Sequence, residues 1–139
     1  MNGRVRTGWA ATALAAVTAG CVVAAIGAGA GGGVYFTSRG AEGVVPASLE
    51  RAASATDRAF HNLKIKRTKV EKTETEQDDG DRKREISGHA GGRNEDVTVT
   101  LEAEGRGSTR VQVVARKSTV TWDKDFARAV LEKIVQFVR

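Results

Sequence analysis

The chain of 139 residues contains one cysteine, Cys21, and two histidines, His61 and His89. A single cysteine cannot form a disulfide within the chain, so an apolar core must hold the fold together. Neither histidine has a ligand-type neighbour at the spacing of a metal site, so we expect no metal, no cofactor and no catalytic residue. We expect His61 near the end of a helix, where it complements the helix dipole, and His89 exposed at the end of a strand.

Aromatic residues make up only 5% of the chain, which leaves binding of single-stranded nucleic acid by base stacking without support. The formal net charge is +5, of which the first two arginines supply two, and this mild excess does not require an anionic partner. The basic residues that follow the first predicted helix are accompanied by acids. We interpret them as a solvated face of a predicted hairpin rather than as a binding stripe: Lys64, Lys66, Arg67, Lys69, Lys72, Arg82, Lys83 and Arg84.

Charge is also missing from residues 8–36, and this stretch contains a secretion-like leader. Arg4 and Arg6 provide a positive beginning, and an apolar segment follows up to Gly20. Small residues immediately before a lone cysteine are typical of a bacterial lipoprotein signal, although Thr18 stands where a large aliphatic residue is usual. We therefore predict a signal peptide over residues 1–20 and lipidation of Cys21.

A transmembrane helix is the alternative interpretation, because such a helix needs only about 20 uncharged residues. Small residues recur every four positions, at Gly20, Ala24, Ala28 and Gly32, which is the spacing that lets membrane helices approach closely. However, a segment made mostly of glycine and alanine buries little apolar area. We interpret residues 21–33 as the lipidated cysteine and a flexible tether of about 20 Å. Residues 27–32 match Gly-x-Gly-x-x-Gly, the motif of dinucleotide-binding sites, but no strand is predicted before them. We therefore attribute the match to the Gly/Ala-rich composition of this segment.

The remaining residues, 34–139, are predicted to form one domain. A short strand is expected at residues 34–37, and a second short apolar run at Val44-Val45. Ser48 is a good N-cap for an amphipathic helix. The apolar face of that helix follows the helical period: Leu49, Ala52, Ala53, Thr56, Ala59, Phe60 and Leu63.

Four strands are predicted next, joined by turns. In the first, the odd spacing between Ile65 and Val70 indicates a bulge or a register change. Asp79-Gly80 is a strong hairpin signal. Residues 97–104 alternate most clearly, which indicates a half-buried strand. The inward rows are expected to contain Ile86, Gly88, Ala90, Val97, Val99, Leu101, Ala103, Val111, Val113 and Ala115.

A terminal helix is predicted from about Asp123 to Val138, capped by Thr121 or Asp123. Its apolar stripe contains Ala127, Val130, Leu131, Ile134, Phe137 and Val138. Two amphipathic helices and a sheet with one apolar face bury each other. The predicted fold class is α+β, an antiparallel four- to five-stranded meander with two helices packed on one face.

These features together resemble a family of short bacterial envelope lipoproteins that carries a domain of unknown function. The resemblance is carried by the Gly-Cys leader, the Gly/Ala-rich stretch, and Pro46-Ala47-Ser48-Leu49 opening a helix. A four-strand meander and Leu-Glu-Lys-Ile at residues 131–134 complete it. The resemblance implies lipid anchoring at Cys21 and a domain that faces the periplasm. It implies no catalytic residues.

The sequence therefore predicts a non-catalytic cell-envelope protein, anchored in the cell membrane or outer membrane by lipid on Cys21. We expect a structural or partner-binding domain whose partner is another envelope protein and not nucleic acid. Two alternatives stay open. One is a single-span membrane protein that associates through its Gly-rich helix, and the other is an enzyme or ligand-binding module whose site lies between sheet and helices.

Overall fold

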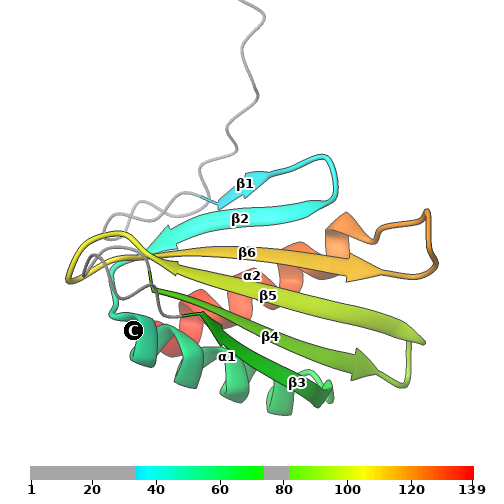
Figure 1. Cartoon of the computed structure of the whole chain (residues 1–139). Helices are drawn as coiled ribbons and strands as arrows, with labels where there is room; N and C mark the ends of the chain where they lie inside the picture. The colour runs from blue at the N-terminus through cyan, green and yellow to red at the C-terminus, as the bar shows by residue number, and fades with distance from the viewer. Residues whose placement is uncertain (1–33, 74–81) are drawn as a thin grey trace, which may run out of the picture.

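The computed structural model describes residues 34–73 and 82–139. Its elements are β1 (Val34–Phe36), β2 (Gly40–Val45), α1 (Leu49–Asn62), β3 (Lys66–Thr73), β4 (Lys83–Ala90), β5 (Glu95–Ala103), β6 (Thr109–Arg116) and α2 (Lys124–Val138). The strands form one sheet in the order β1-β2-β6-β5-β4-β3, and all neighbours are antiparallel (Figure 1). The α+β class is confirmed, with six strands where the sequence predicts four or five.

The additional strand is β2, of which only Val44-Val45 stands out as an apolar run in the sequence. Its first four residues include Gly40, Ala41 and Gly43, which are weak strand formers. Pairing with β6 nevertheless places it inside the sheet. A Cβ atom at Gly40 would lie 2.0 Å from the carbonyl oxygen of Val113, so the close approach of the two strands requires glycine there.

Both helices begin at the predicted caps. The Ser48 hydroxyl accepts a hydrogen bond from the Arg51 backbone N–H (3.4 Å), and the Asp123 carboxylate accepts one from Phe126 N–H (2.9 Å). The predicted face of α1 is buried from Leu49 to Phe60, and Leu63 is partly buried. In α2 the predicted stripe is buried except for Phe137, which is only partly buried, and Phe126 is buried as well.

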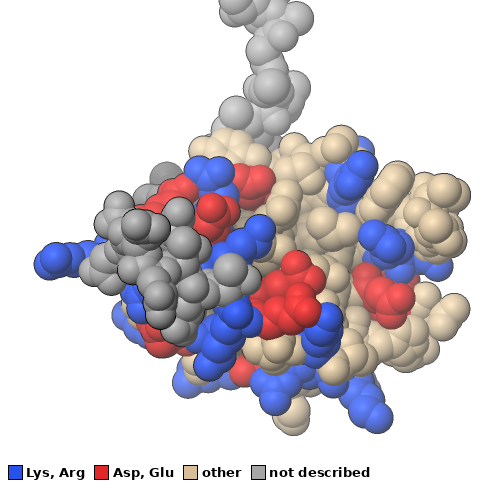
Figure 2. All heavy atoms as spheres, viewed as in Figure 1, with Lys and Arg blue, Asp and Glu red and all other residues tan. Residues whose placement is uncertain are grey.

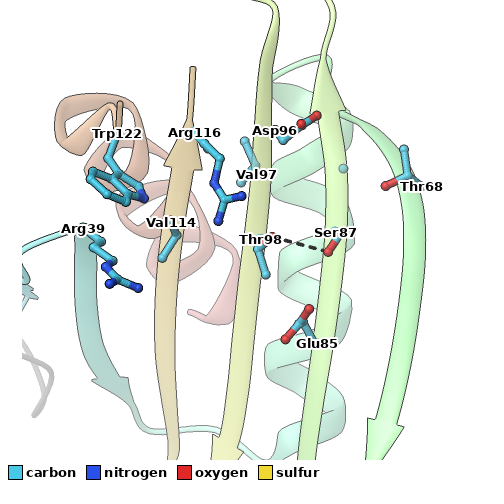
Figure 3. A pocket seen from close by; sticks show the side chains of 11 residues that line it. Arg39, Thr68, Glu85, Ser87, Asp96, Val97, Thr98, Val114, Arg116 and Trp122 are labelled. Atoms are coloured by element: carbon cyan, nitrogen blue, oxygen red, sulfur yellow. Dashed lines mark hydrogen bonds between the residues drawn. The ribbon is translucent and has the colours of Figure 1, made fainter. Parts of the chain in front are cut away.

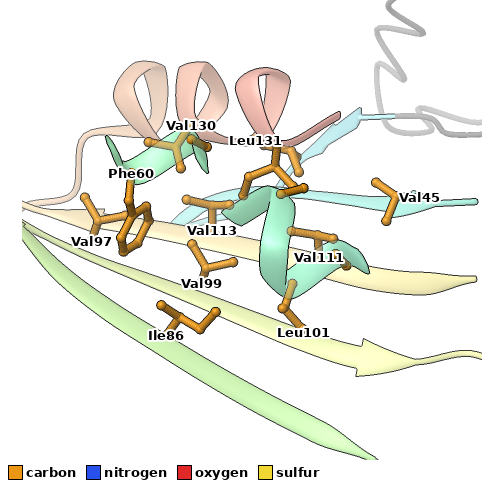
Figure 4. Close-up of a cluster of buried hydrophobic side chains, with 14 of the residues drawn as sticks. Val45, Phe60, Ile86, Val97, Val99, Leu101, Val111, Val113, Val130 and Leu131 are labelled. Atoms are coloured by element: carbon orange, nitrogen blue, oxygen red, sulfur yellow. The ribbon is translucent and has the colours of Figure 1, made fainter. Parts of the chain in front are cut away.

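The two helices lie on the same face of the sheet (Figure 1). α1 packs against β4 and β5, α2 packs against β2 and β6, and the helices contact each other. Figure 4 shows the resulting core, in which Phe60 and Leu131 meet the inward side chains of the strands. All ten predicted inward residues of β4, β5 and β6 are buried, as expected from their alternation.

The prediction of a bulge or a register change in this strand is also confirmed, because the β3–β4 register shifts between Arg67 and Lys69. The predicted Asp79-Gly80 turn lies outside the described residues. Neither α1 nor α2 covers the second face of the sheet, so among residues 34–73 and 82–139 its outward side chains are not buried by a helix.

Candidate functional site

The predicted lipidation residue, Cys21, lies outside the described residues. The same holds for the predicted signal peptide (1–20), for the tether (21–33) and for the glycine motif at 27–32. These assignments stay predictions. Among residues 34–73 and 82–139, no helix is long and apolar enough to cross a membrane.

The uncovered face of the sheet carries side chains in register across four strands. One row consists of Arg116, Asp96, His89 and Lys66, each opposite the next on neighbouring strands. The adjacent row contains three shorter side chains, Val114, Thr98 and Ser87, and ends with Lys69 at the sheet edge. Short side chains beside long ones leave a depression on an otherwise flat surface.

This depression is a hollow of about 550 Å³, open to solvent, which we call the open-face hollow (Figure 3). Residues from six separate stretches of the chain line it: Arg39, Thr68, Glu85, Ser87, Gly88, Asp96, Val97, Thr98, Val114, Arg116 and Trp122. Its volume lies within the usual range for small-molecule sites, which is roughly 300–1,000 Å³.

One wall of the hollow is cationic and aromatic. The Arg39 guanidinium lies over the Trp122 ring, 5.4 Å from its centroid. Arg116 lies on β6, and Figure 3 shows Val114 between the two arginines. Within the described part of the chain, neither arginine makes an ion pair, and the buried Trp122 Nε1–H has no acceptor.

His89 has an acidic partner, Asp96, that was not predicted from the sequence. Its Nδ1 lies 2.8 Å from Asp96 Oδ1, and its side chain is 41% exposed, so the expectation of a solvent-facing histidine is confirmed. The turn at residues 91–94 places Ala90 opposite Glu95 and therefore His89 opposite Asp96. Counting the hairpin register outward from that turn could have found the pair.

Ser87 precedes His89 by two residues on the same face of β4. Its hydroxyl lies 3.4 Å from Thr98 Oγ1, and no hydrogen bond among the described residues joins it to His89. A serine nucleophile needs such a bond to its base. The arrangement provides hydroxyl groups and one oriented imidazole, which suit hydrogen bonding to a ligand.

A second cluster of charges lies at the same end of the sheet, on the helix side. Glu95 is 1% exposed, and its Oε1 lies 3.6 Å from both Arg93 Nε and Lys117 Nζ. Asp123 contacts the same two cations, at 3.2 Å from Arg93 and 3.0 Å from Lys117. The Phe126 N–H, and then both cations, lower the pKa of Asp123 from 3.8 to about 2. The cluster ties the β4–β5 turn to the beginning of α2.

The chain matches a known protein family. The DUF3568 family, described as a protein of unknown function, matches residues 7–136. The chain belongs to this family. No curated protein matches the chain. The match begins within the leader-like segment, and it includes Cys21 together with nearly the whole described domain.

The basic hairpin of this DUF3568 domain forms as predicted, since β3 pairs with β4. Strand alternation divides its cations between the two faces: Lys66, Lys69 and Lys83 share the open face, whereas Arg67, Lys72 and Arg84 are on the helix side. Several pair with acids, including Arg67 with Asp57, Lys69 with Glu71 and Arg82 with Glu50. Positive and negative atoms are accordingly interleaved on the face shown in Figure 2.

His61 is exposed in the last turn of α1, as predicted. It lines a shallow depression with Asp57, Arg58, Asn62 and Phe137. Over the described ranges, no group of three or more His, Cys, Asp or Glu side chains is placed to hold a metal ion. Of these two depressions, the open-face hollow is the larger and offers more polar groups to a ligand.

Proposed function

We propose that this DUF3568 protein is a lipid-anchored protein of the bacterial cell envelope whose domain binds a partner without catalysing a reaction. The observation that carries the proposal is the position of the only cysteine, directly after the small residues Ala19 and Gly20 that end a leader. The family match supports it, because the matched residues include this cysteine.

Lipid on Cys21 would hold the domain at a membrane surface through residues 22–33. A Gly-rich tether of this length spans about 20 Å on average, so the domain would stay close to that surface. Because the leader directs export, the domain would face the periplasm or the exterior. Val22 follows the cysteine in place of an aspartate. In a cell with two membranes, this residue favours the outer membrane.

Binding is favoured over catalysis by the arrangement on the open face. A hydrolase of the serine type needs a hydroxyl, an imidazole and a carboxylate connected in one chain of hydrogen bonds. Here the hydroxyl of Ser87 contacts Thr98, while His89 contacts Asp96. Both polar pairs project from the sheet face opposite α1 and α2, where they are available to an envelope protein or another ligand.

Metabolic labelling with a lipid precursor tests the anchoring. We expect label in the wild-type protein and none in Cys21→Ala, which should also stay unprocessed or leave the membrane fraction. Ser108→Cys on a Cys21→Ala background is a matched control, because it restores one thiol to the chain at a different position. Unlabelled wild-type protein that stays in the membrane would support the single-span alternative.

The ligand-binding alternative has a specific observation in its favour, although the hollow lies on the open face of the sheet and not between the sheet and the helices, where the sequence predicts it. The open-face hollow combines two arginines, a tryptophan and hydroxyl groups within one depression. This alternative is compatible with lipid anchoring, because the hollow and Cys21 belong to different parts of the chain.

A further inference from the structure

We propose that the open-face hollow binds an acidic saccharide, meaning a sugar chain whose rings carry carboxylate groups. The inference deepens the proposed function by naming the chemistry of the partner. The inference rests on one part of the proposed function, namely that the domain binds a partner. Binding in the hollow and lipid on Cys21 are separately measurable, so either proposal can fail without the other.

Two arginines at one side of the hollow provide the carboxylate site. Arg39 and Arg116 flank Val114, and both side chains are exposed (Figure 3). Other arginines of the domain, such as Arg93 and Arg110, are already paired with acids. A guanidinium without an acidic partner presents a planar fork of N–H donors that matches a carboxylate in two-point contact.

Trp122 adds a flat apolar surface to this wall. It forms an isolated bridge with Arg116 at the end of β6, and Arg39 lies over its ring. Sugar rings have apolar C–H faces that pack on such surfaces, and tryptophan combines an apolar body with one N–H donor. That donor, Nε1–H, has no acceptor among the described residues, and the ring, carbonyl or carboxylate oxygens of a saccharide are acceptors.

The floor and the opposite wall fit the hydroxyl groups of a sugar. Ser87 and Thr98 offer hydroxyls on the floor, and Glu85 and Asp96 offer carboxylates. These two acids accept hydrogen bonds from sugar hydroxyls but repel a dense polyanion. The closely spaced phosphates of a nucleic acid or of an anionic lipid surface would be repelled by both acids while they contact the arginines. A saccharide with spaced carboxylates can place its carboxylates at the arginines and its hydroxyl groups at the acids.

The test uses the full-length protein in detergent, with Trp9→Phe so that Trp122 is the remaining tryptophan. The probe is a short oligogalacturonide, and its methyl ester is the matched neutral probe. We expect the acid form to change Trp122 fluorescence saturably. Arg116→Gln should weaken binding at least about tenfold, because hydrogen bonds between charged groups are among the stronger ones. Arg106→Gln, on the turn at the other end of β6, should leave binding unchanged.

Several results would overturn the proposal. The methyl ester binding as tightly as the acid would exclude the arginine–carboxylate contact. An oligoglutamate binding equally well would show that charge alone is recognised, and tighter binding to anionic vesicles would assign the hollow to lipid. Equal weakening by Arg106→Gln and Arg116→Gln would mean diffuse attraction, and the absence of saturable binding of the acid probe would refute the site.

Discussion

Single residues of β5 illustrate how strongly alternation determines each side chain's environment. Leu101 is completely buried in the core, whereas its neighbour Thr100 faces the uncovered side of the sheet. The period of a strand is two residues, so consecutive side chains belong to opposite faces. Burial of Val97, Val99 and Leu101 was therefore predictable from the sequence, because a short regular pattern sufficed.

Leu101→Ala should lower the free energy of unfolding by about 2–5 kcal/mol, since it leaves a cavity in a packed core. Thr100→Ala should change it by less than about 0.5 kcal/mol, because this side chain leaves no cavity. Urea denaturation of both variants measures the difference. Similar losses at the two positions would contradict the assignment of faces.

Asp123 is a residue whose charge stabilises the fold. Asp123→Ala removes the N-cap of α2 and should cost about 1 kcal/mol at neutral pH. The folded-state pKa is lowered to about 2, so this stabilisation is present above the ordinary pKa of 3.8 and is lost as pH falls toward 2. The difference in unfolding free energy between wild type and Asp123→Ala should therefore shrink in acid.

Urea denaturation at pH 7 and near pH 2 measures this change. Asp125→Ala is the matched control, because that exposed acid lies in the same turn but does not cap the helix. Its effect should be smaller at neutral pH. A stability difference for Asp123→Ala that is the same at both pH values would contradict the role of its charge.

Among whole elements, those with a regular period were predictable and β2 was not. α1 and α2 combine a capping residue with an apolar face, and both signals are local in the sequence. β2 instead begins with glycine and alanine, and its stability comes from pairing with β6, which is distant in the chain. Local patterns carry no information about that pairing.

Gly40→Ala tests the close approach between β2 and β6. The new methyl group would collide with the Val113 carbonyl, so the strands must move apart at a cost of about 1–3 kcal/mol. Gly91→Ala is the matched control, because nothing lies within 4 Å of a Cβ at that position. Thermal or urea unfolding compares the two, and a Gly40→Ala variant as stable as Gly91→Ala would show that the strands are farther apart.

At the scale of the whole molecule, the sequence predicts the layers but not the sheet order or the hollow. Facing apolar surfaces of helices and strands indicate the two layers. The hollow instead depends on bringing Arg39, Ser87, Asp96 and Trp122 together through long-range pairing. Each of these residues is unremarkable in its local sequence, so only the strand order identifies the site.

The fragment 34–139 should fold on its own without lipid, metal or disulfide, because residues 34–73 and 82–139 contain a continuous core of buried apolar side chains. Circular dichroism and Trp122 fluorescence should report one coincident urea transition. A fragment that unfolds or aggregates unless residues 1–33 or detergent are restored would contradict an independent domain.

The central claim is that Cys21 anchors the protein, and the intact mass of the membrane-extracted protein tests it most directly. We predict a chain that lacks residues 1–20 and begins at Cys21 with covalently bound lipid. A mass equal to the unmodified chain with residues 1–20 retained would contradict the claim and favour a membrane-spanning leader.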